Sequence, residues 1–250
     1  MANLGSSPDR DPIDVFRVAR AEVLATVAAA CRRAGRDPSE VTLVAVSKTV
    51  DAVRLGFAVA AGLTLLGVNR VQEAEIKAPV LPGAHWHLIG PLQSNKARRA
   101  VELFEVIQSV DSVDLARRLD RMAGELGCAP LGVYLQVNVD IDEAKSGFRP
   151  EELPKDLPAM AALANLRLLG LMTVGRLTAT AEEARPTFVQ LRELSAHLRR
   201  GVEELGPGLS MGMSGDFAVA VEEGATVIRV GRAIFGARPA VGTDAGLGRI

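Results

Sequence analysis

Lys48 is the residue whose type and position most readily supply chemistry. It ends an apolar, β-branched run over residues 41–48, a pattern that predicts a buried strand. Folds of the α/β class place their ligand sites at the carboxyl ends of strands. A desolvated amine there would be an uncharged nucleophile, suited to a Schiff base with a carbonyl compound. A surface lysine that merely ends a strand is the simpler interpretation of this segment alone.

Two segments near the end of the chain could hold a phosphate. Residues 210–216 (SMGMSGD) follow an apolar run and lead into a helical pattern, and Ser214 adds a hydroxyl group. Gly231 follows the last apolar run, between Arg229 and Arg232. Backbone N–H groups in such turns bind anions, and barrels often hold phosphate after strands seven and eight. Small-residue turns usually only join elements, but two in these places favour a phosphate site.

Other polar residues at predicted strand ends are less specific. His85 and His87 share one face of a strand, as metal ligands can, but His197 is the only other histidine and no carboxylate cluster accompanies the pair. We therefore expect no metal site. Asn69 ends a predicted strand and could bind a ligand or cap the next helix. The polar loop over residues 140–145 is expected to be solvated.

The apolar runs alternate with helical patterns. Strands are predicted at residues 41–48, 63–68, 86–92, 106–110, 132–139, 166–174, 209–213 and 227–235. Helices are predicted at residues 14–34, 52–61, 71–77, 96–103, 111–127, 151–163, 181–205 and 217–223.

Several strands are apolar on both faces, which is typical of parallel strands covered by helices. Eight β/α units in 250 residues favour a closed single-domain (β/α)8 TIM barrel, with an open doubly wound sheet as the alternative. No linker composition divides the chain. We expect a flexible N-terminus at residues 1–13, a barrel domain at 14–240 and a C-terminal tail at 241–250.

Composition narrows the class of partner. A formal net charge of −1 with 48% apolar residues argues against a disordered chain and a polyanion binder, so nucleic acid is not expected. Cys31 and Cys128 form no C-x-x-C pair, which gives no support for a disulfide framework or a zinc knuckle. No signal peptide or membrane-length run is present, and we predict a cytoplasmic protein.

Taken together, the segments resemble one known family. The matching motifs are residues 44–48 (VAVSK), 67–73 (GVNRVQE), 86–96 (WHLIGPLQSNK), 109–112 (SVDS), 137–138 (VN), 145–148 (KSGF), 170–172 (GLM), 209–216 (LSMGMSGD) and 230–236 (VGRAIFG). This set is similar to the pyridoxal 5′-phosphate (PLP) homeostasis family of PLP-binding proteins, whose fold is like the N-terminal barrel domain of alanine racemase. The resemblance covers about residues 14–238. Val68 departs from it, because the family usually has Glu at this position.

The resemblance implies roles for individual residues. Lys48 would hold PLP as a Schiff base. Ser214 and the backbone N–H groups of Gly231 and Arg232 would bind its phosphate.

Three further residues complete the implied site. Arg229 would lie near the pyridine nitrogen, Asn69 would line the pocket and Met172 would form an apolar wall. Because arginine does not protonate that nitrogen as a carboxylic acid would, the ring is a weaker electron sink than in transaminases.

Three functions are compatible with these residues. The favoured one is a PLP carrier or regulator that could deliver PLP to apo-enzymes, and the same resemblance leads us to expect a monomer. A PLP-dependent amino-acid racemase is the alternative, although racemases of this fold add a second domain and a catalytic tyrosine, and Tyr134 lies within a predicted strand. An aldolase acting on a phosphorylated sugar through Lys48 is the third.

Overall fold

The computed structural model describes residues 11–128, 130–176 and 178–237, and its strands form a closed parallel barrel. The strands follow one another round the barrel in chain order, and β8 pairs with β1 to close it. They are β1 (Thr42–Val46), β2 (Leu65–Val68), β3 (His85–Leu88), β4 (Val106–Val110), β5 (Leu131–Gln136), β6 (Leu166–Met172), β7 (Gly208–Met213) and β8 (Val227–Val230). The expected (β/α)8 barrel is confirmed, and the open sheet is not observed.

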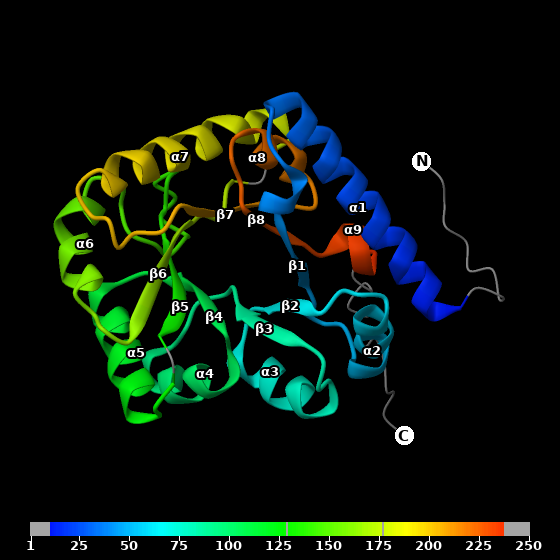
Figure 1. Cartoon of the computed structure of the whole chain (residues 1–250), viewed down its shortest axis with the longest axis horizontal. Coiled ribbons are helices and arrows are strands. Elements are labelled where there is room, and N and C mark those ends of the chain that lie inside the picture. The colour runs from blue at the N-terminus through cyan, green and yellow to red at the C-terminus, as the bar shows by residue number, and fades with distance from the viewer. Residues whose placement is uncertain (1–10, 129, 177, 238–250) are drawn as a thin grey trace, which may run out of the picture.

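Helices surround the barrel on its outside (Figure 1). They are α1 (Pro12–Ala34), α2 (Ala52–Ala60), α3 (Val71–Lys77), α4 (Ala97–Leu103), α5 (Val113–Glu125), α6 (Leu153–Ala161), α7 (Arg185–Arg199), α8 (Phe217–Glu222) and α9 (Arg232–Phe235). In the described ranges, single-turn 3₁₀ helices lie between a strand and an α-helix at η1 (Pro38–Glu40), η2 (Ala78–Val80), η3 (Ser94–Lys96) and η4 (Glu182–Ala184).

The first helix, α1, precedes the barrel and lies along the outside of its closing strands (Figure 1). Asp11 caps it by accepting from the backbone N–H of Ile13 at 3.0 Å, so the helix begins inside the segment expected to be a flexible N-terminus. The Phe16 ring lies 5.7 Å from that of Phe235, and Arg54 donates to the Phe235 carbonyl at 2.7 Å. These contacts fix the short helix α9 against α1 and α2.

The eighth strand is shorter than the sequence predicts. An apolar run over residues 227–235 predicts one strand, but β8 ends at Val230 and Gly231 caps α9. Ile234 and Phe235 are buried because α9 turns them toward α1, and not because they continue a strand. The predicted third strand and the predicted helix over residues 181–205 are also longer than observed, since β3 ends at Leu88 and α7 at Arg199.

Two clusters of apolar side chains form the core. The larger lies between the strands and the helices, and the smaller lies inside the barrel around Val44, Tyr134, Met172 and Val227. Side chains alternate between the two faces of each strand, so residues 44 and 46 share the inward face of β1, and Lys48 lies two residues beyond its end. The inner cluster therefore forms a floor beneath the carboxyl ends of the strands.

A bulge in β6 lets it pack closely on β7. The register of β5 with β6 shifts between Val133 and Tyr134, and Gly170 has φ of +148°. A Cβ on Gly170 would lie within 1.9 Å of the Gly208 carbonyl oxygen. Only glycine can occupy this position without moving a strand.

Gly170→Ala should therefore lower the free energy of unfolding by at least about 2 kcal/mol. Gly83→Ala is the matched control, because its Cβ would make an ordinary contact of 3.6 Å with Val59. Chemical denaturation of both variants measures the difference. Equal stability of the two would show that the backbones of β6 and β7 can separate at little cost.

Candidate functional site

The predicted ligand residues lie at the carboxyl ends of neighbouring strands. Lys48 follows β1, Asn69 follows β2 and Ser214 follows β7, while Gly231 follows β8. Because β1 lies between β2 and β8, and β8 also pairs with β7, all four of these ends are adjacent. The structure thus brings together residues that are far apart in the chain.

A tight turn directs Lys48, which is half-buried. The Val50 N–H donates to the Ser47 carbonyl at 3.2 Å, so residues 47–50 form a β-turn. Thr49, its third residue, has φ of +66°, a conformation that is uncommon for residues other than glycine and strained for a β-branched one. Strain of this kind is retained mainly where function requires a fixed geometry.

A buried lysine at the end of α3 anchors the first residue of this turn. Lys77 is 9% exposed, and its Nζ donates to the Ser47 carbonyl at 3.0 Å. The same ammonium group lies 3.4 Å from Glu73 Oε2. Ser47 also donates backbone and side-chain hydrogen bonds to Gly67 on β2, at 2.9 and 3.3 Å. The residue before Lys48 is therefore held from two neighbouring elements.

The loops after β7 and β8 are joined by one hydroxyl group. Ser214 Oγ accepts from the backbone N–H of Gly231 at 3.1 Å and from that of Ala233 at 3.4 Å. Both N–H groups belong to the first turn of α9, where backbone donors lack partners within the helix. The hydroxyl thereby joins the loop after β7 to the first turn of α9, whose backbone donors are of the kind that bind a phosphate.

Gly231 lies directly beside the strand that carries Lys48. A Cβ at this position would come within 3.3 Å of the Val46 carbonyl oxygen and 3.4 Å of Val46 Cβ. The close approach of the two backbones places the first turn of α9 next to the end of β1. Arg232, the following residue, is exposed.

Arg229 is buried inside the barrel, below this loop. It is 4% exposed and stands opposite Val44 in the pairing of β1 with β8. Burial lowers its pKa to about 10, partly offset by the charge of Asp216. The guanidinium group therefore stays charged at neutral pH. Met172, at the end of β6, is fully buried in the inner cluster beside Val44.

A hollow of about 250 Å³ opens at the same end of the barrel, just below the roughly 300 Å³ at which small-molecule sites begin. Asn69 lines it, together with Gln136, Asn138 and Lys145, which were not among the residues predicted for the site. The expectation of a solvated loop after β5 is wrong for Lys145. Its side chain is 24% exposed and donates to the Gly175 carbonyl at 3.0 Å.

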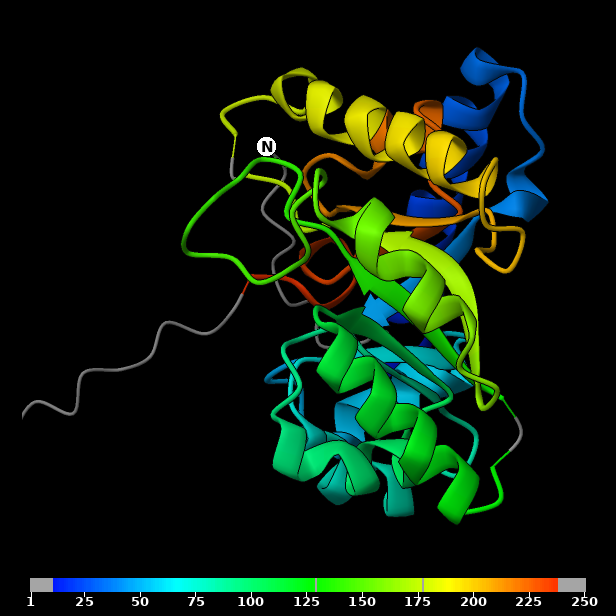
Figure 2. The same cartoon turned by 90° about the vertical axis from the view of Figure 1, so that its left-hand side faces the viewer.

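The sequence contained a signal for two of these additional residues. Gln136 and Asn138 are two apart at the end of one strand, so they share the inward face. Figure 2 shows the segment after β5 standing out from one end of the barrel, where it forms one side of this hollow.

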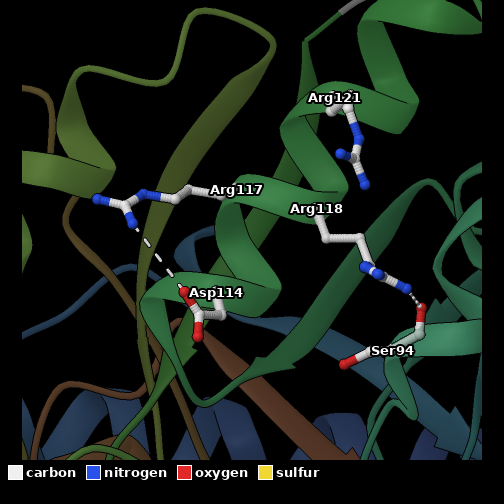
Figure 3. A pocket seen from close by; sticks show the side chains of 5 residues that line it. All are labelled: Ser94, Asp114, Arg117, Arg118 and Arg121. Carbon is white, nitrogen blue, oxygen red and sulfur yellow. Dashed lines mark hydrogen bonds and ion pairs between the residues drawn. The ribbon is translucent and has the colours of Figure 1, made fainter.

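A second hollow, of about 370 Å³, lies outside the barrel between η3 and α5. Figure 3 shows its lining, which is Ser94, Asp114, Arg117, Arg118 and Arg121. Arg118 donates to the Ser94 carbonyl at 2.9 Å, while Arg117 and Asp114 are 62% and 97% exposed. This hollow is a solvated basic surface and contains none of the predicted ligand residues.

The two histidines of β3 have separate partners. His85 Nδ1 lies 2.6 Å from Glu105 Oε1 on the surface, whereas His87 is buried against Gln108. Among residues 11–128, 130–176 and 178–237, no three His, Cys, Asp or Glu side chains lie close enough to hold a metal ion. In the same ranges, no helix is both long and apolar enough to cross a membrane.

Comparison with known proteins first defines a class. A family model described as the N-terminal domain of alanine racemase matches residues 21–239. The alanine racemase of Clostridium difficile 630 superposes with a TM-score of 0.70 at 14% identity, over 91% of this chain and 58% of that one. This similarity shows the barrel fold alone.

More similar proteins define the family within that class. The pyridoxal phosphate homeostasis protein of Pseudomonas aeruginosa is 46% identical over 220 residues, or 87% of this chain and 94% of that protein. The protein of that name from Escherichia coli K12 is 38% identical over 231 residues, with coverages of 87% and 94%. PipY of Synechococcus elongatus PCC7942, solved with PLP bound, has a TM-score of 0.77 at 42% identity over 88% of this chain and all of that one. This chain belongs to the pyridoxal phosphate homeostasis protein family.

Thr49→Asn should raise the free energy of unfolding by about 0.5 to 1 kcal/mol, because asparagine tolerates positive φ. The hydrogen bond from Thr49 Oγ1 to the Lys48 carbonyl is lost in this variant but is exposed. Thr49→Ala loses the same hydroxyl and keeps most of the backbone strain. Its free energy of unfolding should therefore rise less than that of Thr49→Asn. Denaturation midpoints compare the three proteins. Equal midpoints for both variants would contradict strain at this turn.

Proposed function

We propose that this protein binds pyridoxal 5′-phosphate reversibly and buffers or delivers it, with Lys48 as the covalent anchor. The observation that carries the proposal is the pairing of β1 with β8, which sets the Lys48 turn beside the loop that holds Gly231. An amine and a phosphate seat are two separate anchors for one rigid molecule. The aldehyde of PLP and a lysine amine form a Schiff base with loss of one water.

The remaining residues fit the same ligand. Ser214 and the N–H groups of Gly231 and Arg232 bind the phosphate, Arg229 lies at the pyridine nitrogen, and Asn69 lines the pocket. The fit rests on donor chemistry, since backbone N–H groups and a hydroxyl already converge at the first turn of α9.

Two residues at the edge of this set are apolar. Met172 lies under the ring as an apolar wall. Val68 is fully buried in the larger core, so the family's usual glutamate is replaced by a packing residue here. Residues 14–240 form the PLP-binding unit.

The protein acts as a carrier or regulator and not as an enzyme. Relatives at 38% to 46% identity are named homeostasis proteins, and a related PipY structure contains PLP, whereas the racemase similarity is 14%. Tyr134, the one tyrosine in the sequence, is 6% exposed inside the barrel, and burial raises its pKa. A racemase would need a second acid or base on the opposite face of its substrate.

The cellular setting follows from the same assignment. The protein works in the cytoplasm as a monomer, and PLP-dependent apo-enzymes receive the cofactor from it. Its influence on amino-acid and keto-acid balance is then indirect, through the supply of PLP.

Lys48→Ala should abolish the covalent PLP adduct while the barrel stays folded, because a half-buried strand-end amine contributes little to packing. Borohydride reduction followed by peptide mass spectrometry measures the adduct. Lys155→Ala, an exposed lysine on α6, is the matched control and should keep it. An equal yield of lysine adduct in Lys48→Ala and in the unsubstituted protein, mapped to a lysine other than Lys48, would contradict the assignment.

Ser214→Ala should weaken binding of PLP by about 1 to 3 kcal/mol, the usual effect of losing a hydrogen bond to a charged group. Pyridoxal, which lacks the phosphate, is the control ligand and should bind both proteins equally. Titration calorimetry with the two ligands separates phosphate recognition from a general loosening of α9. An equal loss for both ligands would place the phosphate elsewhere.

A further inference from the structure

Four buried polar side chains form a continuous chain inside the barrel. Arg229 Nη1 donates to Ser210 Oγ at 2.6 Å, Ser210 Oγ donates to Gln108 Oε1 at 2.6 Å, and Gln108 Nε2 lies 2.8 Å from His87 Nδ1. Their exposed fractions are 4%, 0%, 0% and 7%. The link from Gln108 on β4 to Ser210 on β7 joins strands that are not neighbours, so the chain crosses the barrel interior.

The hydrogen bonds that link these four side chains all run in one direction, from Arg229 to His87. Arginine can only donate, so Ser210 accepts from it and gives its own O–H to Gln108 Oε1. The amide nitrogen of Gln108 then faces His87, whose Nδ1 must accept. His87 is therefore neutral and carries its proton on Nε2. Burial lowers the His87 pKa to about 4, which agrees with a neutral ring.

A second bond fixes the plane of the guanidinium group. Arg229 Nη2 donates to the Thr173 carbonyl at 2.7 Å, and Thr173 Oγ1 in turn donates to the Val137 carbonyl at 2.8 Å. Both terminal nitrogens are thus bonded to the wall on the β6 and β7 side. Arg229 stands opposite Val44 on β1, and Lys48 follows the carboxyl end of the same strand.

Packing alone does not explain why these hydrogen-bonded polar side chains are fully buried. Apolar residues of similar volume usually stabilise a core as well as or better than buried charges do. The hydrogen-bonded side chains from Arg229 to His87 instead hold one cation, the Arg229 guanidinium group, inside the barrel below Lys48. Every proton in it points away from Arg229, so the chain supplies no acidic proton to a ligand held there.

We propose that His87, Gln108 and Ser210 are positioning residues that hold the Arg229 guanidinium at the ring of bound PLP, with the His87 proton on Nε2. This inference rests on the proposed function and deepens it. The ring nitrogen receives a hydrogen-bond donor of fixed orientation that cannot give up its proton. The three positioning residues thereby keep the site suited to holding PLP.

The first test needs no ligand. Nitrogen-15 NMR of the histidine rings in the whole apo protein should show His87 as the neutral Nε2–H form from pH 5 to 8. Gln108→Glu replaces the donor to Nδ1 with an acceptor, so His87 should take up a proton and its pKa should rise by at least two units. The charged and titratable groups near His87 are His85, Glu105 and, through the chain, Arg229. His85, on the surface, is the control resonance.

The second test uses PLP. Ser210→Ala cuts Arg229 from the chain but keeps its bond to Thr173, and should raise the PLP dissociation rate at least tenfold and shift the absorbance band of bound PLP. His85→Gln, on the same strand and outside the chain, should change neither. If Ser210→Ala does not fold, Gln108→Glu serves for the same two measurements.

The outcomes are distinguishable. His87 protonated on Nδ1, or PLP release and spectrum unchanged in Ser210→Ala and Gln108→Glu, would overturn the inference. An unmodified protein that does not bind PLP, but shows His87 in the Nε2–H form, would overturn the proposed function and with it the ligand role of the chain.

Discussion

The parallel pairing of β1 with β8 is the constraint on which the site depends. It sets Val44 opposite Arg229 and Ala45 opposite Val230, so the first and last strands of the barrel share one edge. Lys48 and the Gly231 loop come together only because the barrel closes. In an open sheet with the same elements, the amine and the phosphate seat would belong to opposite edges. Barrel closure and ligand binding are thus one structural property.

Burial of charge is the second constraint, and the fold meets it with partners drawn from several strands. Lys77 is bonded to the Ser47 carbonyl, and Arg229 to Ser210 and the Thr173 carbonyl. Unpartnered, either group would be costly to bury. These three hydrogen bonds act on segments next to predicted ligand residues. The polar groups beneath the site therefore stabilise the barrel and orient the residues above it.

Much of the fold was predictable because burial on both faces leaves a plain pattern. Strands such as β5, buried along its whole length, appear as continuous apolar runs separated by helical patterns. The same pattern misplaced the end of β8, since apolar residues of α9 follow it directly and periodicity over four residues cannot separate a helix turn from a strand. Gly231 was the available signal for the break.

The site was predictable in part, for a different reason. Lys48 and Ser214 stand at strand ends, and position along the chain is enough to select them. Lys145 depends on how the segment after β5 folds back over the barrel, which no local pattern describes. The chain from His87 to Arg229 depends on contacts between strands that are not neighbours in the barrel, and these exist only once it has closed.

The most direct test of the central claim is a crystal structure of the protein grown with PLP. The account predicts continuous density from Lys48 Nζ to the ring, the phosphate against Ser214, Gly231 and Arg232, and the ring nitrogen facing Arg229. Density for PLP at the arginines of α5, or at Lys145 with Lys48 unmodified, would contradict it.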